Sequence, residues 1–141
     1  VRELAAFIEL CHTNEIHVVA FIPPYANRVF QRLEEERSQF PHVFDLRAKL
    51  HPIFNRHGFK LFDFSDLKSV GSNDYETYDG FHASETAYLK LIRIMADQDS
   101  VLSGVLSKPD IKNMLGALHS ARQVIKEIEE PHPKLPTPIN R

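Results

Sequence analysis

The chain has 141 residues, of which 43% are hydrophobic and 26% charged, and its formal net charge is -2. This composition is typical of a globular domain with its own core and excludes a disordered chain. Basic residues are interleaved with acidic ones, so we expect no nucleic-acid partner. The longest apolar run, residues 18–22, is too short to span a membrane.

Cysteine content and the chain start say little about location. Cys11 is the single cysteine of the sequence, so no internal disulfide can form. The sequence therefore does not determine the cellular compartment and only slightly favours an extracytoplasmic one. No signal peptide is visible, and the first residue is Val1 rather than Met. We therefore expect either a processed start or a fragment of a longer protein.

The first part of the chain predicts a helix followed by a strand. Apolar residues recur at helical spacing over residues 2–11, and this helix should end near Asn14. Residues 16–22 are almost continuously apolar and rich in β-branched side chains, which predicts a strand buried on both faces. The prolines at positions 23 and 24 should end that strand, since proline cannot donate to a sheet.

Two helices and a second strand are expected next. Residues 25–37 and 43–57 both have helical patterns, although Pro52 lies inside the second and is expected to kink it. Gly58 stands where a glycine commonly follows a helix. Residues 59–64 then predict a short strand.

The rest of the chain predicts a long loop, helices and a tail. Residues 65–81 have no clear period and form an unusually long connection, and such connections are often functional. Residues 83–96 predict a helix, and residues 110–130 predict one or two more. The tail, residues 131–141, holds four prolines and should be extended or disordered.

This order of elements predicts an α/β fold in which a parallel sheet is covered by helices. Only two strands are convincing, and two strands rarely make an independent sheet. We expect residues 1–130 to be the C-terminal part of a flavodoxin-like three-layer α/β/α domain, with residues 131–141 as its tail. The two strands should be parallel neighbours.

The segment from Tyr78 to Ser84 follows the second strand and opens a helix. An Asp and a His three residues apart, Asp79 and His82, can converge on one turn, and Gly80 allows the tight fold between them. The Asp79 carboxylate would accept a hydrogen bond from Nδ1 of His82 and fix the imidazole tautomer. Nε2 would then be available as a general base toward a nucleophile.

Asp79-Gly80-Phe81-His82 and the helix after it resemble the last conserved block of the SGNH (GDSL-type) hydrolases and acyltransferases. The resemblance covers roughly residues 16–96. It implies that His82 is the catalytic base and Asp79 its orienting carboxylate. It also implies ester hydrolysis or O-acyl transfer through a serine ester, on an ester or an acylated glycan, without a cofactor.

The same resemblance exposes what the chain lacks. We find no Gly-Asp-Ser block that would supply the nucleophile, and no assigned oxyanion donors. Gly71-Ser72-Asn73-Asp74 matches the letters of the family's oxyanion block, but it lies in the wrong loop, and we interpret the match as coincidence. Ser84 is interpreted as a helix N-cap rather than a nucleophile. The N-terminal half of the same protein should therefore be required, and the chain alone should be inactive.

Other interpretations compete with this one. Asp79 and His82 could simply form a turn and a helix start. The eight histidines lack ligand-like spacing, so no metal site is expected; His17 and Cys11 are interpreted as core residues. The chain could also be a non-catalytic interaction or glycan-binding module. A Gly-Asp-Ser segment upstream of Val1 would favour the enzyme, and a native start at Val1 would favour the module.

Overall fold

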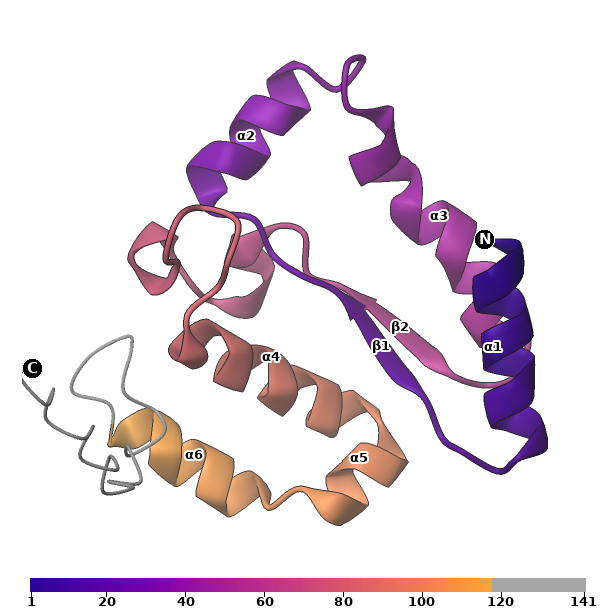
Figure 1. Cartoon of the computed structure of the whole chain (residues 1–141). Coiled ribbons are helices and arrows are strands. Elements are labelled where there is room, and N and C mark those ends of the chain that lie inside the picture. Colours follow the sequence, from indigo (N-terminus) through magenta and orange to yellow (C-terminus); the bar gives the residue numbers. More distant parts are fainter. Residues whose placement is uncertain (118–141) are drawn as a thin grey trace, which may run out of the picture.

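The structure is a computed structural model that describes residues 1–117. It is a mixed α/β fold in which helices predominate around a small sheet (Figure 1). The sheet pairs β1 (Val19–Ile22) with β2 (Lys60–Asp63) in parallel, in a register that places Val19 opposite Lys60. The prediction of two neighbouring parallel strands is confirmed.

The helices of the described part follow the sequence pattern closely. They are α1 (Arg2–Thr13), α2 (Asn27–Glu35), α3 (Pro41–Asn55), α4 (Glu85–Gln98), α5 (Ser100–Val105) and α6 (Lys108–Gly116). The predicted helices over residues 2–11, 25–37, 43–57 and 83–96 correspond to α1 to α4. The short α5 was not predicted. The predicted helical stretch from residue 118 onward and the tail lie outside the described residues.

Helices pack against both faces of the sheet and form two apolar clusters. The first joins α4 to one face and to the loop that follows β2; its buried members are Phe62, Phe64, Leu67, Val70, Ala83, Ala87, Leu91 and Met95. The second joins α1 and α3 to the other face; its buried members are Ile8, Cys11, Phe54 and Phe59. Cys11 is therefore a core residue, as predicted.

The prediction of a long strand buried on both faces is only partly right. β1 begins at Val19, three residues later than expected, and Ile16 and Phe21 are 55% and 39% exposed. The reason is the small sheet: in the described part of the chain β1 has β2 along one edge and no strand along the other. β1 does end before Pro23, as predicted.

α3 continues through Pro52 to Asn55. Because proline has no N–H, the carbonyl of Ala48 loses its usual helical donor there. Gly58 follows the end of α3 with a φ of +72°, as predicted for a glycine at the C-terminal end of a helix.

The segments that follow β1 and β2 remain hydrogen-bonded to each other beyond the sheet. The amide of Phe64 donates to the carbonyl of Ile22 at 3.1 Å, and that of Tyr25 donates to the carbonyl of Ser65 at 3.0 Å. The long connection after β2 contains two 3₁₀ turns, Leu67–Val70 and Asp74–Glu76. It lies at the end of the sheet to which both strands point, beside the start of α2 (Figure 1).

Candidate functional site

Asp79 and His82 lie in contact, as their spacing predicts. Nδ1 of His82 is 2.7 Å from Oδ2 of Asp79. The other carboxylate oxygen, Oδ1, accepts from the backbone N–H groups of Phe81 at 2.9 Å and His82 at 2.8 Å. The carboxylate is thus held by the backbone on one side and faces the imidazole with the other.

This arrangement favours the ionised carboxylate. The hydrogen bond with the His82 side chain, followed by the two backbone N–H groups, lowers the pKa of Asp79 from 3.8 to about 2. A carboxylate beside Nδ1 selects the imidazole tautomer that leaves Nε2 as the acceptor. Both side chains are open to solvent, at 53% exposure for Asp79 and 74% for His82.

The turn that carries the pair is docked onto the start of α2. The carbonyl of Gly80 accepts from the amide of Ala26 at 2.8 Å. Gly80 has a φ of +88°, and a Cβ atom there would lie 3.0 Å from Cγ2 of Val29. Both the positive φ and the close approach to Val29 favour glycine at this position. This contact ties the pair to the segment that follows the carboxyl end of β1.

Asp74 makes a second link between the loop and α2. α2 has no side-chain cap of its own, and Oδ1 of Asp74 accepts from the amide of Asn27 at 2.6 Å. Its other oxygen lies 3.3 Å from Nε of Arg28. A carboxylate at a helix N-terminus satisfies open N–H groups and complements the helix dipole. Sequence reasoning missed this cap, because nothing local connects two residues so far apart in the chain.

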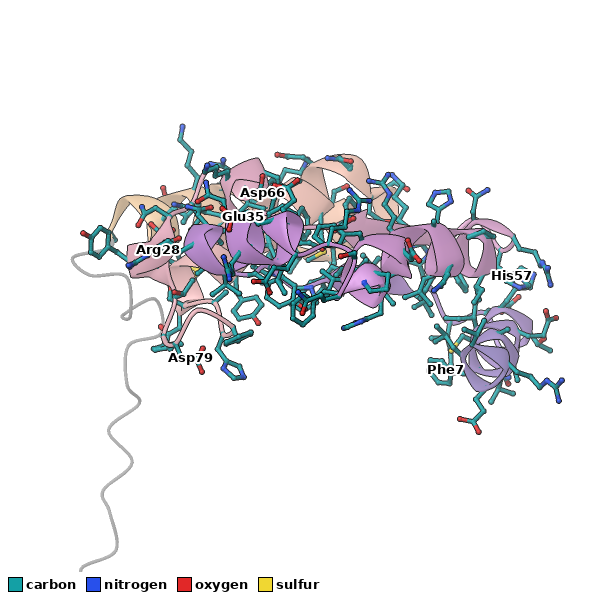
Figure 2. The ribbon with its side chains drawn as sticks, turned by 90° about the horizontal axis from the view of Figure 1, so that it is seen from above. Phe7, Arg28, Glu35, His57, Asp66 and Asp79 are labelled. Carbon is teal, nitrogen blue, oxygen red and sulfur yellow. The ribbon has the colours of Figure 1, made fainter. Side chains whose placement is uncertain are left out.

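Figure 2 shows where the pair lies in the molecule. Asp79 is on a loop that projects from the body of the fold, at the end opposite to Phe7 of α1. Phe81, between the two residues, is 58% exposed and packs edge-on against Tyr25 with ring centroids 6.1 Å apart. The pair is accordingly accessible, with an aromatic side chain beside it.

The serines near the pair in sequence are engaged elsewhere. Ser84 is 1% exposed, and its Oγ accepts from the amide of Ala87, which confirms the predicted N-cap of α4. The Oγ of Ser72 donates to the carboxylate of Glu76, and that of Ser65 donates to Asp63. Asn73, in the same Gly71-Ser72-Asn73-Asp74 stretch, accepts from the amide of Tyr75 and caps a 3₁₀ turn. Each of these side chains has a structural role in the loop.

His17 was predicted to be a satisfied core histidine; it is paired, but it is not a core residue, because its side chain is 28% exposed. Its Nε2 lies 3.1 Å from Oδ2 of Asp99, whose side chain is 3% exposed. Burial opposes the ionisation of Asp99, but the amide of Leu102 and the imidazole of His17 lower its pKa. This contact links the segment before β1 to the corner between α4 and α5, far from the Asp79–His82 pair.

Residues 1–117 contain neither a cluster of metal ligands nor a membrane-spanning helix. In this part of the chain, no three His, Cys, Asp or Glu side chains come together as a metal site would need. Nor does any helix there have the length and apolar character needed to cross a membrane. Asp79 and His82 are thus the one predicted site for which the structure supplies a chemical arrangement.

Comparisons with protein families, with curated proteins and with solved structures gave no match for this chain. The interpretation of the Asp79–His82 pair therefore rests on its geometry and on the local sequence.

Proposed function

We propose that this chain supplies the His and Asp of a serine-dependent acyl hydrolase or acyltransferase of the SGNH type. His82 is the general base that takes the proton of a serine hydroxyl, and Asp79 orients the imidazole and stabilises its protonated form. The observation that carries the proposal is the 2.7 Å contact between Nδ1 of His82 and Asp79 at the carboxyl end of a parallel pair of strands.

The position in the fold supports this role. In open α/β sheets, ligands bind beyond the carboxyl ends of the strands. The loop with Asp79 follows β2 and is hydrogen-bonded to the segment that follows β1. We propose that the two strands are part of a larger flavodoxin-like sheet, with helices in layers on both sides. The segment that completes this sheet carries the nucleophilic serine and the oxyanion donors.

The proposed reaction class follows from the chemistry of a serine hydroxyl and the His82 imidazole. A serine activated by His82 attacks the carbonyl of an ester, and the alkoxide leaves with the proton that His82 returns to it. Water then resolves the acyl-serine in a hydrolase, or an acceptor hydroxyl does so in a transferase. The proposed substrate is an ester or an acylated glycan. Neither step needs a cofactor, because the imidazole, the serine of the other segment and the ester itself supply all the reacting groups.

The test uses the protein in which this chain is joined to its serine-bearing segment. His82→Ala should lower turnover of p-nitrophenyl acetate by on the order of 10⁴-fold, because a serine hydroxyl is a weak nucleophile without its base. Asp79→Asn should also lower turnover by orders of magnitude, because an amide favours the wrong imidazole tautomer.

The matched control is His51→Ala, which removes an exposed histidine from α3. It should leave turnover unchanged, and circular dichroism should show that all three variants are folded. Unchanged turnover in a folded His82→Ala variant would refute the proposed function. Binding of an acylated glycan without any turnover would favour a non-catalytic module instead.

A further inference from the structure

A partly buried ion pair lies at the base of the loop that carries Asp79 and His82. Nζ of Lys90 is 2.9 Å from Oε1 and 2.7 Å from Oε2 of Glu76, and the two side chains are 20% and 16% exposed. Nζ also donates to the carbonyl of Gly71 at 2.9 Å, and Ser72 donates to the same Glu76 carboxylate. Charges this poorly hydrated need such partners to be tolerated.

Glu76 is also part of the base of the loop. Its carbonyl accepts from the amide of Ser84 at 2.8 Å, and the carbonyl of His82 accepts from the amide of Tyr78 at 2.8 Å. Between these two bonds, Thr77 and Ala83 form an antiparallel bridge. The loop is therefore closed by backbone contacts on the side of Glu76, and Asp79 and His82 sit at its open end.

The rigid partner in this arrangement is α4. Lys90 precedes Leu91, which is 0% exposed in the core between α4 and the sheet. Asp79 and His82 are solvent-exposed, so core packing does not hold their side chains directly. The backbone bonds of Glu76 and Thr77 tie the base of the loop to the start of α4, and the Lys90–Glu76 pair adds a side-chain tie to the next turn of that helix.

We infer that Lys90 is a positioning residue: by fixing Glu76 it holds the base of the loop and keeps Asp79 in contact with His82. The catalytic consequence rests on the proposed function, whereas the effect on the loop does not. A hydrogen bond made at an exposed loop tip forms only as often as the loop adopts the bonded geometry. Loosening the base should therefore weaken the Asp79–His82 contact without touching either residue.

The direct test follows the Asp79 carboxyl carbon by ¹³C NMR as the pH is lowered. The contact with His82 is the largest cause of the low pKa of Asp79, about 2 against 3.8. In Lys90→Met the titration midpoint should move up toward 3.8, and Lys90→Arg, which can still pair with Glu76, should restore the low midpoint. If Lys90→Met does not fold, Glu76→Gln is the alternative variant, and it should also raise the titration midpoint of Asp79.

Two controls separate positioning from general loosening. Lys108→Met breaks the exposed pair with Asp97 and should leave the Asp79 midpoint unchanged. Met95→Ala removes a buried side chain of α4 from the same core, so it lowers stability while leaving the Lys90–Glu76 pair intact. An unchanged midpoint in Lys90→Met and Glu76→Gln, or an equal rise in Met95→Ala, would overturn the inference.

The kinetic test uses the protein that contains the serine-bearing segment. Lys90→Met should lower kcat/KM for p-nitrophenyl acetate by about 10- to 100-fold, as expected when catalytic groups are misplaced by about 1 Å. Lys90→Arg should recover most of it, and the loss should fall on kcat rather than KM. Full activity in a folded Lys90→Met variant would contradict the inference. Failure of the proposed function would instead appear as activity in His82→Ala, whatever the NMR midpoints.

Discussion

The two oxygens of Asp79 have different partners, and this division determines how the residue titrates. Oδ1 is held by two backbone N–H groups and Oδ2 by the His82 imidazole. Because these bonds favour the charged form, the folded pKa lies below the unfolded one. The contact therefore stabilises the folded loop fully above a pH of about 4, and this contribution is lost as the pH falls toward about 2.

The expected outcome is a carboxylate that stays ionised at pH 3. A ¹³C titration of Asp79 should have its midpoint at about 2 rather than 3.8. In His82→Ala the midpoint should rise, but not fully, because the two backbone donors remain. A midpoint near 3.8 in the unaltered protein would mean that the contact with His82 is not formed in solution.

Ser84 offers a structural prediction at the same scale. Ser84→Ala should lower the free energy of unfolding by about 1 kcal/mol, because it removes the N-cap of α4. It should leave catalysis by the complete protein nearly unchanged. Ser107→Ala removes the exposed N-cap of α6 and is the matched control for a cap alone. Urea denaturation measures both variants; a large loss of turnover in Ser84→Ala would indicate a chemical role for this hydroxyl.

The sequence predicts contacts between residues that are close together in the chain, but not contacts between residues that are far apart in it. Asp79 and His82 are three residues apart, and Ser84 directly precedes its helix, so spacing alone indicates their contacts. Lys90 and Glu76 are separated by the loop and the first turns of α4, and Asp74 is 47 residues from Asn27, whose amide it accepts from at the start of α2. No periodicity links such pairs, because only the packing of α4 and α2 around the sheet brings them together.

At the scale of elements, the turn at Gly80 and the start of α2 act as one unit. The amide of Ala26 donates to the Gly80 carbonyl, and a Cβ atom at Gly80 would lie 3.0 Å from Cγ2 of Val29, so that one of the two would have to shift. Gly80→Ala should cost roughly 1–2 kcal/mol for the unfavourable backbone angle alone. The close contact with Val29 should add to that cost and push the turn away from α2.

Gly71→Ala is the control for this prediction. Gly71 also has a positive φ, +68°, but a Cβ atom there would meet nothing within 4 Å. Gly71→Ala should therefore lower the free energy of unfolding through its unfavourable backbone angle, without displacing the turn at Gly80. Urea denaturation gives the two costs, and the amide signals of Phe81 and His82 report the position of the turn by NMR. Equal effects of the two substitutions would show that the contact with Val29 does not matter.

The elements themselves were predictable where their pattern was long. α1, α3 and α4 have apolar residues at helical spacing over three turns or more, and the sequence placed their ends within a few residues. α5 spans only Ser100–Val105 and has no buried residue, so no pattern marks it. It forms because the Asp99 side chain caps it while bonded to His17, a contact that depends on the fold.

At the scale of the whole molecule, the sheet and the proposed site each lack a part among the described residues. β1 has one neighbouring strand in the described part of the chain, and Phe21 within β1 is 39% exposed. The proposed site has an imidazole and a carboxylate in contact, whereas the buried serines of the loop are hydrogen-bonded to other groups. A further segment beside β1 would both cover that edge and bring a nucleophile to the carboxyl end of the sheet.

The last prediction is that residues 1–141 alone do not turn over p-nitrophenyl acetate above the rate of free imidazole at the same concentration. His82 by itself can act only as an exposed imidazole, since stabilisation of the oxyanion and an activated serine supply most of the rate. Adding the serine-bearing segment should restore turnover, and Asp79→Asn should abolish the restored activity. Robust activity of the chain alone would refute this view and make Ser72 the first residue to replace. Since the Oγ of Ser72 donates to Glu76 and the side chain is 8% exposed, we expect Ser72→Ala to leave the restored activity intact.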